Sequence, residues 1–208
     1  MHISKHLHSC LLVKEQNKTL LIDPGIFTYQ EKALDLEKIE KLDYLLATHE
    51  HSDHLYLPFV KEIVAKFPQI KIITNASLVE LLKKEGIESS SSGDEIVKLE
   101  SVPHEKLWDT EPPENVMVTV FGKLASPGDS HHFETNAEVL ALPLVAPWGS
   151  TTEAVNLALK LHPKVIIPIH DWLYKDSIRK NMYQRLKEFF QTKGIDFKAM
   201  ETGEIVEV

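Results

Sequence analysis

The sequence of 208 residues is poor in cysteine, in arginine and in positive charge. With Cys10 as its only cysteine, the chain cannot form an internal disulfide, and a reducing compartment fits best. Arginine occurs only at Arg179 and Arg185, so the side chain that best grips phosphate groups in a fork is nearly absent. The 23 Lys and Arg residues face 31 Asp and Glu residues, a net charge of -8. This acidic balance argues against a nucleic-acid-binding surface.

Long apolar runs and flexible linkers are also missing. No apolar stretch approaches the roughly 20 residues that a membrane-spanning helix needs. The first residues are polar and rich in histidine, without the apolar core of a signal peptide. The four-serine run within residues 88–94 is only as long as a loop. We therefore expect a soluble, cytoplasmic protein without membrane contact, folded as a single domain over residues 1–208.

One short stretch of the sequence is unusually rich in candidate metal ligands. Residues 48–54 read Thr-His-Glu-His-Ser-Asp-His, and we call this stretch the metal loop. In an extended segment His49 and His51 point to the same side and can bind one ion, while Asp53 and His54 can bind a second ion beside it. Imidazole and carboxylate suit zinc, manganese and iron. The alternative is a His-rich surface loop or a tag remnant, but this stretch is internal, spaced and flanked by apolar segments.

The apolar pattern predicts strands alternating with helices. We expect strands at residues 10–13, 19–22, 44–47, 70–74, 95–102, 115–121, 124–125, 139–142, 164–169, 197 and 204–208. Helices are expected at residues 56–67, 75–86, 150–161 and 176–193, with a short irregular helix between residues 34 and 42. The longest helix is predicted to face inward with Ile178, Met182, Leu186, Phe189 and Phe190. This order favours helices covering the outer faces of sheets.

Four further side chains belong with the metal loop by chemistry and placement. His104, Asp129 and His170 each follow a predicted strand, and His8 precedes the strand at residues 10–13. Loops at strand ends bring side chains from distant parts of a chain together, and α/β proteins usually build their sites there. We therefore expect these four residues near the metal loop.

The metal loop resembles the H-x-H-x-D-H signature of the metallo-β-lactamase-fold hydrolases. Residues 21–25, Leu-Ile-Asp-Pro-Gly, are similar to the strand and turn that precede this signature in the family. Gly128-Asp129 resembles the family's bridging aspartate, and residues 169–171 resemble its last histidine ligand. The resemblance covers almost the whole chain in the right order. Residues 8–10 and the short length look most like the compact branch of ascorbate-6-phosphate lactonase-like hydrolases.

The resemblance implies an α/β fold, an αββα four-layer sandwich in which two mixed β-sheets are flanked by helices. It places the site at one edge of the two sheets. It also implies seven metal ligands. The first ion would be held by His49, His51 and His104, the second by Asp53, His54 and His170, and Asp129 would bridge both.

Two divalent ions, with zinc favoured over manganese or iron, would support hydrolysis. They can generate hydroxide near neutral pH and stabilise the oxygens of the group under attack. We hypothesise attack by metal-bound hydroxide on a small ester, lactone or phosphodiester, with Asp53 orienting the hydroxide and carrying a proton. His8 and Trp148 are candidates for the substrate pocket, although His8 can equally be a structural histidine. Glu105, His131, His132 and Tyr174 lie near ligand positions in the sequence, and ordinary loop roles are the alternative.

Two other functions stay open at this point. A di-iron redox protein can share the fold, but the all-His/Asp ligand set without an additional glutamate counts against it. A non-catalytic metal-binding domain is the other alternative, and the complete ligand set counts against that. Asp23 and Asp171 are candidates to orient the imidazoles by accepting a hydrogen bond from the ring N–H, although Asp171 can equally cap the helix that follows. The sequence leaves open the substrate, the metal and the oligomeric state.

Overall fold

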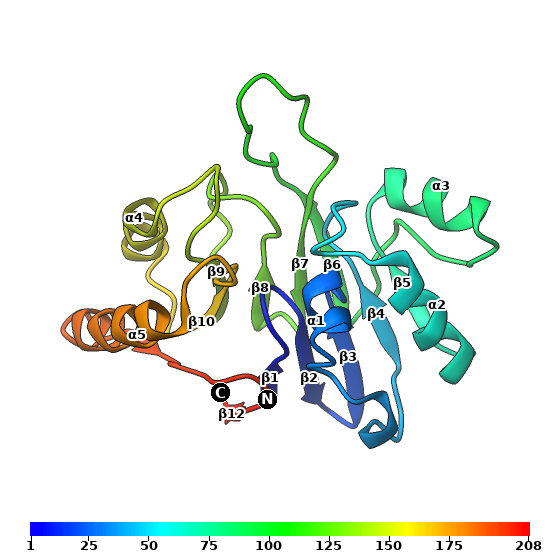
Figure 1. Cartoon of the computed structure of the whole chain (residues 1–208), viewed down its shortest axis with the longest axis horizontal. Coiled ribbons are helices and arrows are strands. Elements are labelled where there is room, and N and C mark those ends of the chain that lie inside the picture. Colours follow the sequence, from blue (N-terminus) through cyan, green and yellow to red (C-terminus); the bar gives the residue numbers. More distant parts are fainter.

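A computed structural model describes residues 1–208, and its centre is formed by two six-stranded β-sheets (Figure 1). The first sheet has the order β12 (Ile205–Glu207), β1 (His2–Lys5), β2 (Leu11–Glu15), β3 (Lys18–Ile22), β4 (Tyr44–Leu46) and β5 (Lys71–Ile73). The second sheet has the order β11 (Asp196–Phe197), β10 (Val165–Ile169), β9 (Val139–Pro143), β8 (Leu124–Ser126), β7 (Val116–Val120) and β6 (Val97–Ser101). Each sheet contains both parallel and antiparallel pairs.

Helices cover the outer face of each sheet (Figure 1). α2 (Leu57–Lys66) and α3 (Ala76–Lys84) lie on the side of the first sheet, and α4 (Thr151–Leu161) and α5 (Asp176–Gln191) on the side of the second. The short α1 (Ile26–Gln30) and a 3₁₀ turn (Leu36–Lys38) complete the set. The predicted α/β fold of four layers, αββα, is confirmed. The chain has no helix with the length and apolar character needed to cross a bilayer.

Alternation along the strands explains why three cores form. Successive side chains of a strand point to opposite faces. In β4, Leu46 packs between the sheets and Leu45 packs under α2 and α3. In β10, Ile167 packs between the sheets and Ile166 packs under α4 and α5. Strands that are apolar on both faces therefore dictate a sheet that is covered on both sides.

Three elements differ from the sequence prediction, and the first is α1, since no helix was predicted over Ile26–Gln30. β1 was not predicted, because three of its four residues are polar and it lacks an apolar run, yet Ile3 and Lys5 are both buried. In α5, Ile178 is 53% exposed and Phe189 is 37% exposed, so their predicted inward orientation is wrong.

Leu186 and Phe190 face inward as predicted, Met182 is partly buried, and Tyr183 completes the buried stripe at helical spacing. One turn before Tyr183, the guanidinium of Arg179 lies 5.2 Å from the Tyr183 ring centroid. Phe189 cannot share the stripe with Phe190, because neighbouring residues point about 100° apart on a helix.

Strand direction brings the site loops to one edge. β3 and β4 are parallel, and β1 is two antiparallel steps from β3, so these three strands end at the same edge. In the second sheet, β8, β9 and β10 are parallel, and β6 is two antiparallel steps from β8. The loops that follow β1, β3, β4, β6, β8 and β10 carry every residue of the candidate site except Trp148, which lies in the loop between β9 and α4.

Candidate metal centre

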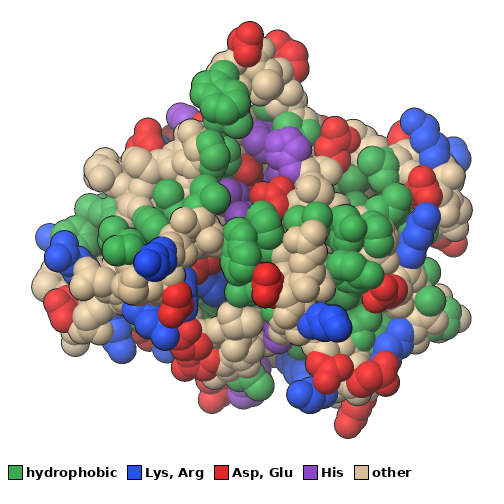
Figure 2. Space-filling model, in the orientation of Figure 1, with side chains coloured by type: hydrophobic (Ala, Val, Ile, Leu, Met, Phe, Trp, Pro, Cys, Tyr) green, Lys and Arg blue, Asp and Glu red, His purple; other side chains and the backbone are tan.

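Eight side chains converge at this edge in two groups, and within each group the ligand atoms lie within 4.8 Å of one another. The first group consists of His49, His51, His104 and Asp129. The second group consists of His8, Asp53, His54 and His170. All seven ligands implied by the sequence are therefore brought together, and His8 joins them. Figure 2 shows histidine side chains gathered with acidic ones in a depression of this face.

Asp129 lies between the two groups. Its Oδ1 is 2.9 Å from Nε2 of His54 and 3.1 Å from Nε2 of His170, both in the second group. Its Oδ2 is 3.7 Å from Nε2 of His104 and 4.0 Å from Nε2 of His49, both in the first group. The carboxylate thus turns one oxygen toward each group.

Hydrogen bonds from behind orient three of the imidazoles. Nδ1 of His54 lies 2.8 Å from Oδ2 of Asp23. Nδ1 of His170 lies 2.9 Å from the carbonyl oxygen of Val145, and Nδ1 of His104 lies 2.6 Å from the carbonyl oxygen of the next residue. Because carboxylate and carbonyl oxygens accept hydrogen bonds, each Nδ1 carries the proton and each Nε2 keeps a lone pair for a metal.

Asp23 holds the metal loop as well as His54. Its carboxylate accepts hydrogen bonds from the backbone N–H of Thr48 at 2.8 Å and from the Thr48 hydroxyl at 2.9 Å. The same hydroxyl oxygen lies 3.1 Å from Nδ1 of His49. Asp171, the other carboxylate considered for this task, accepts hydrogen bonds from Lys5 and Tyr183 instead. Thr48 was missed in the sequence, where only its place beside His49 could have indicated it.

Two glycines allow the ligand loops to approach other backbone segments. A Cβ atom on Gly25 would lie 1.7 Å from the carbonyl oxygen of Asp53. Gly128 has a φ of +61°, and a Cβ there would lie 2.2 Å from Oδ1 of Asn115 and 2.8 Å from Thr48. Any other residue at these positions would displace a loop that carries candidate ligands.

Several polar atoms of the site are buried without a hydrogen-bond partner. They are Nε2 of His49, His54 and His170, Oδ1 of Asp129 and Nδ1 of His8. The two short contacts of Asp129 Oδ1 bring charges close but lack hydrogen-bond alignment. An unpaired buried polar atom costs about 1–3 kcal/mol, so native structures rarely contain several in one place. A divalent cation in each group would satisfy the three Nε2 atoms and Oδ1 of Asp129, and the donor set therefore fits a metal centre.

The electrostatics of the candidate ligands agree with that fit. Burial disfavours the charged form of His54, but the carboxylates of Asp129 and Asp23 raise its pKa well above the ordinary value. Burial and neighbouring imidazoles hold the pKa of His49 well below its ordinary value. Burial works against ionisation of Asp129, yet His170 and His54 hold its pKa low. The low pKa of Asp129 thus keeps it a carboxylate, which is the form that binds a metal.

The site is open on one side. Asp53 is 28% exposed on its side chain, and His51 is exposed, whereas His49 and His54 are fully buried. Nε1 of Trp148 donates a hydrogen bond of 2.8 Å to Oδ2 of Asp129. Solvent and a substrate can therefore approach the two groups from the side of Asp53 and His51.

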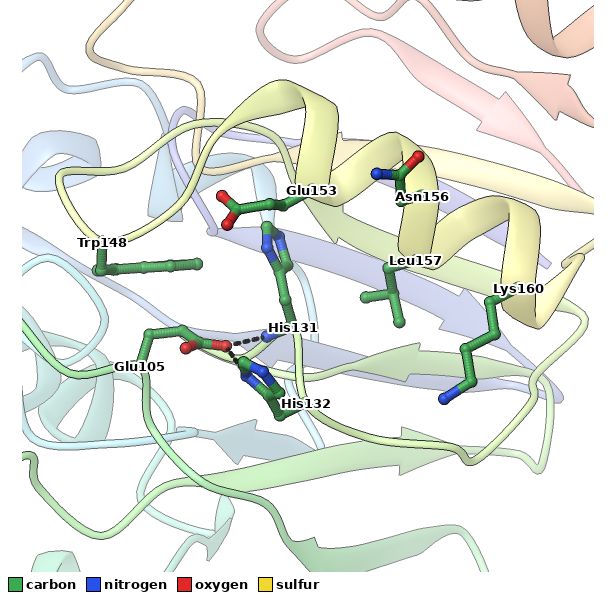
Figure 3. A pocket seen from close by; sticks show the side chains of 8 residues that line it. All are labelled: Glu105, His131, His132, Trp148, Glu153, Asn156, Leu157 and Lys160. Atoms are coloured by element: carbon green, nitrogen blue, oxygen red, sulfur yellow. Dashed lines mark hydrogen bonds and ion pairs between the residues drawn. The ribbon is translucent and has the colours of Figure 1, made fainter.

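A cavity of about 280 Å³ adjoins the centre at Trp148 (Figure 3). Its other lining residues are Glu105, His131, His132, Glu153, Asn156, Leu157 and Lys160. Oε1 of Glu105 accepts hydrogen bonds from the backbone N–H of His131 at 2.8 Å and from Nδ1 of His132 at 2.6 Å (Figure 3). Trp148, predicted at the substrate pocket, lines this cavity. His8, predicted there too, is only 3% exposed and lies against Asp53 instead.

A sequence profile described as "Beta-lactamase superfamily domain" matches residues 2–170. The chain belongs to this superfamily. A protein of Mycobacterium tuberculosis is 28% identical over 213 residues, 96% of each chain. A UPF0173 metal-dependent hydrolase of Nanoarchaeum equitans is 26% identical over 230 residues, 97% of each chain. The resemblance read from the metal loop is thus confirmed at the level of the superfamily.

Solved structures share the superfamily fold. Igni18, a metallo hydrolase of Ignicoccus hospitalis, superposes with a TM-score of 0.72 at 19% identity, over 99% of this chain and 97% of that one. CmlA, a diiron β-hydroxylase of Streptomyces venezuelae, superposes with a TM-score of 0.68 at 13% identity, over 100% of this chain and 54% of that one. At these identities the likeness concerns the fold alone.

Proposed function

We propose that this metal-dependent hydrolase holds two divalent metal ions, one in each group, and cleaves a small ester, lactone or phosphodiester. The observation that carries the proposal is the set of buried, unpaired lone pairs on His49, His54, His170 and Asp129. Hydrogen bonds from behind hold two of the three imidazoles, His54 and His170, with the lone pair facing Asp129. Zinc is the first choice of metal for such nitrogen and oxygen ligands, and manganese and iron suit them as well.

The proposed ligand sets follow the two groups. The first ion would take His49, His51 and His104, the second would take Asp53, His54 and His170, and Asp129 would contact both. The position of Asp129, with one oxygen toward each group, supports the bridging role. Three or four protein ligands for each ion leave positions open for water and substrate, as catalytic sites require.

The bound ions would lower the pKa of coordinated water and stabilise negative charge on the group under attack. Asp53 is the most exposed carboxylate of the site and lies at its open side, so it can orient the attacking water and take up a proton. Trp148 holds Oδ2 of Asp129 through its indole N–H and also lines the adjoining cavity.

The adjoining cavity supports a small-molecule substrate. Its volume of about 280 Å³ is at the lower end of ordinary ligand pockets. Trp148 offers an apolar face, and Glu105 and the α4 side chains offer polar groups for orientation. The net charge of -8 does not favour a nucleic-acid substrate. We also infer that the chain is one domain, because side chains from both sheets share one core and β12 pairs with β1.

The test is metal content per chain in untagged protein, together with hydrolysis of a panel of esters, lactones and phosphodiesters. We expect close to two ions in the wild type, and a loss of both metal and hydrolysis in Asp129→Ala. Asp196→Ala, an exposed aspartate in β11, is the matched control and should keep both. Wild-type protein without bound metal under metal-replete conditions would contradict the proposal.

The same samples test the di-iron redox alternative, for which the fold of the diiron β-hydroxylase is the specific support. Two iron ions with a redox-active visible spectrum, and no hydrolysis of the panel, would favour it. Both groups contain only histidine and aspartate, which leaves hydrolysis as the better-supported chemistry.

A further inference from the structure

His8 is held in place by a tight turn between β1 and β2. Leu7 and His8 both have left-handed backbones, with φ values of 69° and 48°. Non-glycine residues in this region cost about 1–2 kcal/mol each and persist where the surroundings impose them. Here the N–H of Cys10 bonds the carbonyl of Leu7 at 3.0 Å, and the N–H of His170 bonds the carbonyl of His8 at 3.2 Å. Strain of this kind beside a site points to a function for the residue that it places.

The side chain of His8 lies inside the second group. It is 3% exposed, and its Nε2 is 3.1 Å from Oδ2 of Asp53. Its ring centroid is 4.0 Å from that of His170 and 5.4 Å from that of His54. Its Nδ1 is buried and has no hydrogen-bond partner. His8 is therefore near enough to be a metal ligand, and the question is whether its protonation pattern allows that.

The tautomer distinguishes His8 from its neighbours. His54, His104 and His170 each have an oxygen acceptor behind Nδ1, which leaves Nε2 free for a metal. A ligand role through Nε2 would put the proton of His8 on Nδ1, where no acceptor lies, and buried N–H groups without a partner are rare. With the proton on Nε2, the imidazole instead donates a hydrogen bond to a carboxylate, which is the stronger kind of hydrogen bond.

We propose that His8 is a positioning residue, whose Nε2–H donates to Oδ2 of Asp53 and leaves the other carboxylate oxygen for the second ion. The role rests on the proposed function and differs from the substrate contact expected from the sequence. Asp53 is otherwise the least buried carboxylate of the site, so a fixed donor on one oxygen limits its rotation. Groups that hold metal ligands from behind typically contribute 10–100-fold to metal affinity.

The test compares His8→Gln with His8→Leu. The amide nitrogen of glutamine can take the place of Nε2 as a donor but does not bind a metal as an imidazole does. Leucine has a similar size and no donor. The affinity for each of two equivalents of Co²⁺ is measured by titration against a competing chelator, and circular dichroism checks the fold. We expect one of the two affinities to fall 10–100-fold in His8→Leu, and to stay within about threefold of wild type in His8→Gln.

Equal losses in both variants would overturn the proposal in favour of a ligand role, and an unchanged His8→Leu would reduce His8 to packing. If His8→Leu does not fold, His8→Asn replaces it, because the shorter amide cannot reach Asp53 in the same way. A double-mutant cycle with Asp53→Asn adds a second readout, since His8→Leu should cost much less affinity once the carboxylate is gone. Fewer than two Co²⁺ sites in the wild type would contradict the proposed function and not this inference.

Discussion

Asp23 offers the sharpest test of how the site is organised. Its fully buried carboxylate accepts three hydrogen bonds, from Nδ1 of His54, from the backbone N–H of Thr48 and from the Thr48 hydroxyl, at 2.8, 2.8 and 2.9 Å. Asp23→Asn preserves the size of the side chain, and asparagine tolerates the left-handed backbone of this position, which has a φ of 49°. The substitution therefore removes one acceptor oxygen and the charge, and little else.

The expected magnitude follows from the geometry. Asparagine has one acceptor oxygen, so its amide group must face either the Thr48 N–H or Nδ1 of His54. One charge-assisted hydrogen bond, worth about 1.5–3 kcal/mol, is lost, and a buried donor is left unpaired. We expect the free energy of unfolding to fall by about 2–4 kcal/mol. Metal affinity should fall about 10–100-fold, because His54 loses the group that fixes its orientation.

Urea unfolding measures the stability change, and titration with Zn²⁺ against a chelator measures the affinity. Asp171→Asn is the matched control, since Asp171 is buried next to His170 but accepts hydrogen bonds from Lys5 and Tyr183. It should lose stability, with metal affinity close to that of the wild type. The reasoning is refuted if Asp23→Asn binds Zn²⁺ as the wild type does, or if the control loses as much affinity.

Three further outcomes follow. Gly25→Ala should lower the free energy of unfolding, measured in urea, by about 1–3 kcal/mol and weaken metal binding, because the added Cβ would clash with the backbone of the metal loop. Gly86→Ala is the control and should leave metal binding unchanged, because no atom lies near its added Cβ. Trp148→Phe removes the hydrogen bond to Asp129 and should lower kcat/KM about 10-fold on any substrate the wild type hydrolyses; an unchanged value would contradict this role. Burial would raise the pKa of Asp94, but hydrogen bonds from a lysine and two backbone N–H groups lower the pKa from 3.8 to about 2. The contribution of Asp94 to the free energy of unfolding is therefore present above pH 4 and is lost as the pH falls toward 2. After a discount for solvent screening of this partly exposed carboxylate, Asp94→Asn should be less stable than wild type by about 1–2 kcal/mol at pH 6. The difference in urea unfolding should shrink by pH 2.5.

The parts of the site that the sequence predicted are those with local signatures. The metal loop holds three histidines and an aspartate within six residues, and this density alone identifies it as a candidate metal site. His104, Asp129 and His170 could be added to the candidate site because the apolar pattern predicts where strands end, and parallel strands end at the same edge of a sheet. The hydrogen bond that orients His170 could not be foreseen. Its acceptor is the backbone carbonyl of Val145, which any residue would supply.

Strands and helices were predicted well where the apolar pattern was strong. They were predicted poorly where the burial of a side chain depends on a partner that is distant in the sequence. β1 reads as polar because Lys5 carries a charge, yet Asp171 lies 2.7 Å from its Nζ and makes its burial tolerable. That partner is 166 residues away, and no local pattern indicates it. The inward face of α5 was misread for a similar reason, since Arg179 stacks on Tyr183 and pairs with Asp176 and Glu201.

The position of the site also ties it to the stability of the whole fold. The metal loop and His8 follow strands of the first sheet, whereas His104, Asp129 and His170 follow strands of the second. The proposed ions would therefore be bound only when the two sheets are packed in their native arrangement. An ion that binds the folded state alone, present at 1,000 times its Kd, adds about 4 kcal/mol to a total that is typically 5–15 kcal/mol. Such ions would also satisfy buried polar atoms of the site that have no hydrogen-bond partner within the protein. Metal loading should thus govern how firmly the two sheets stay together.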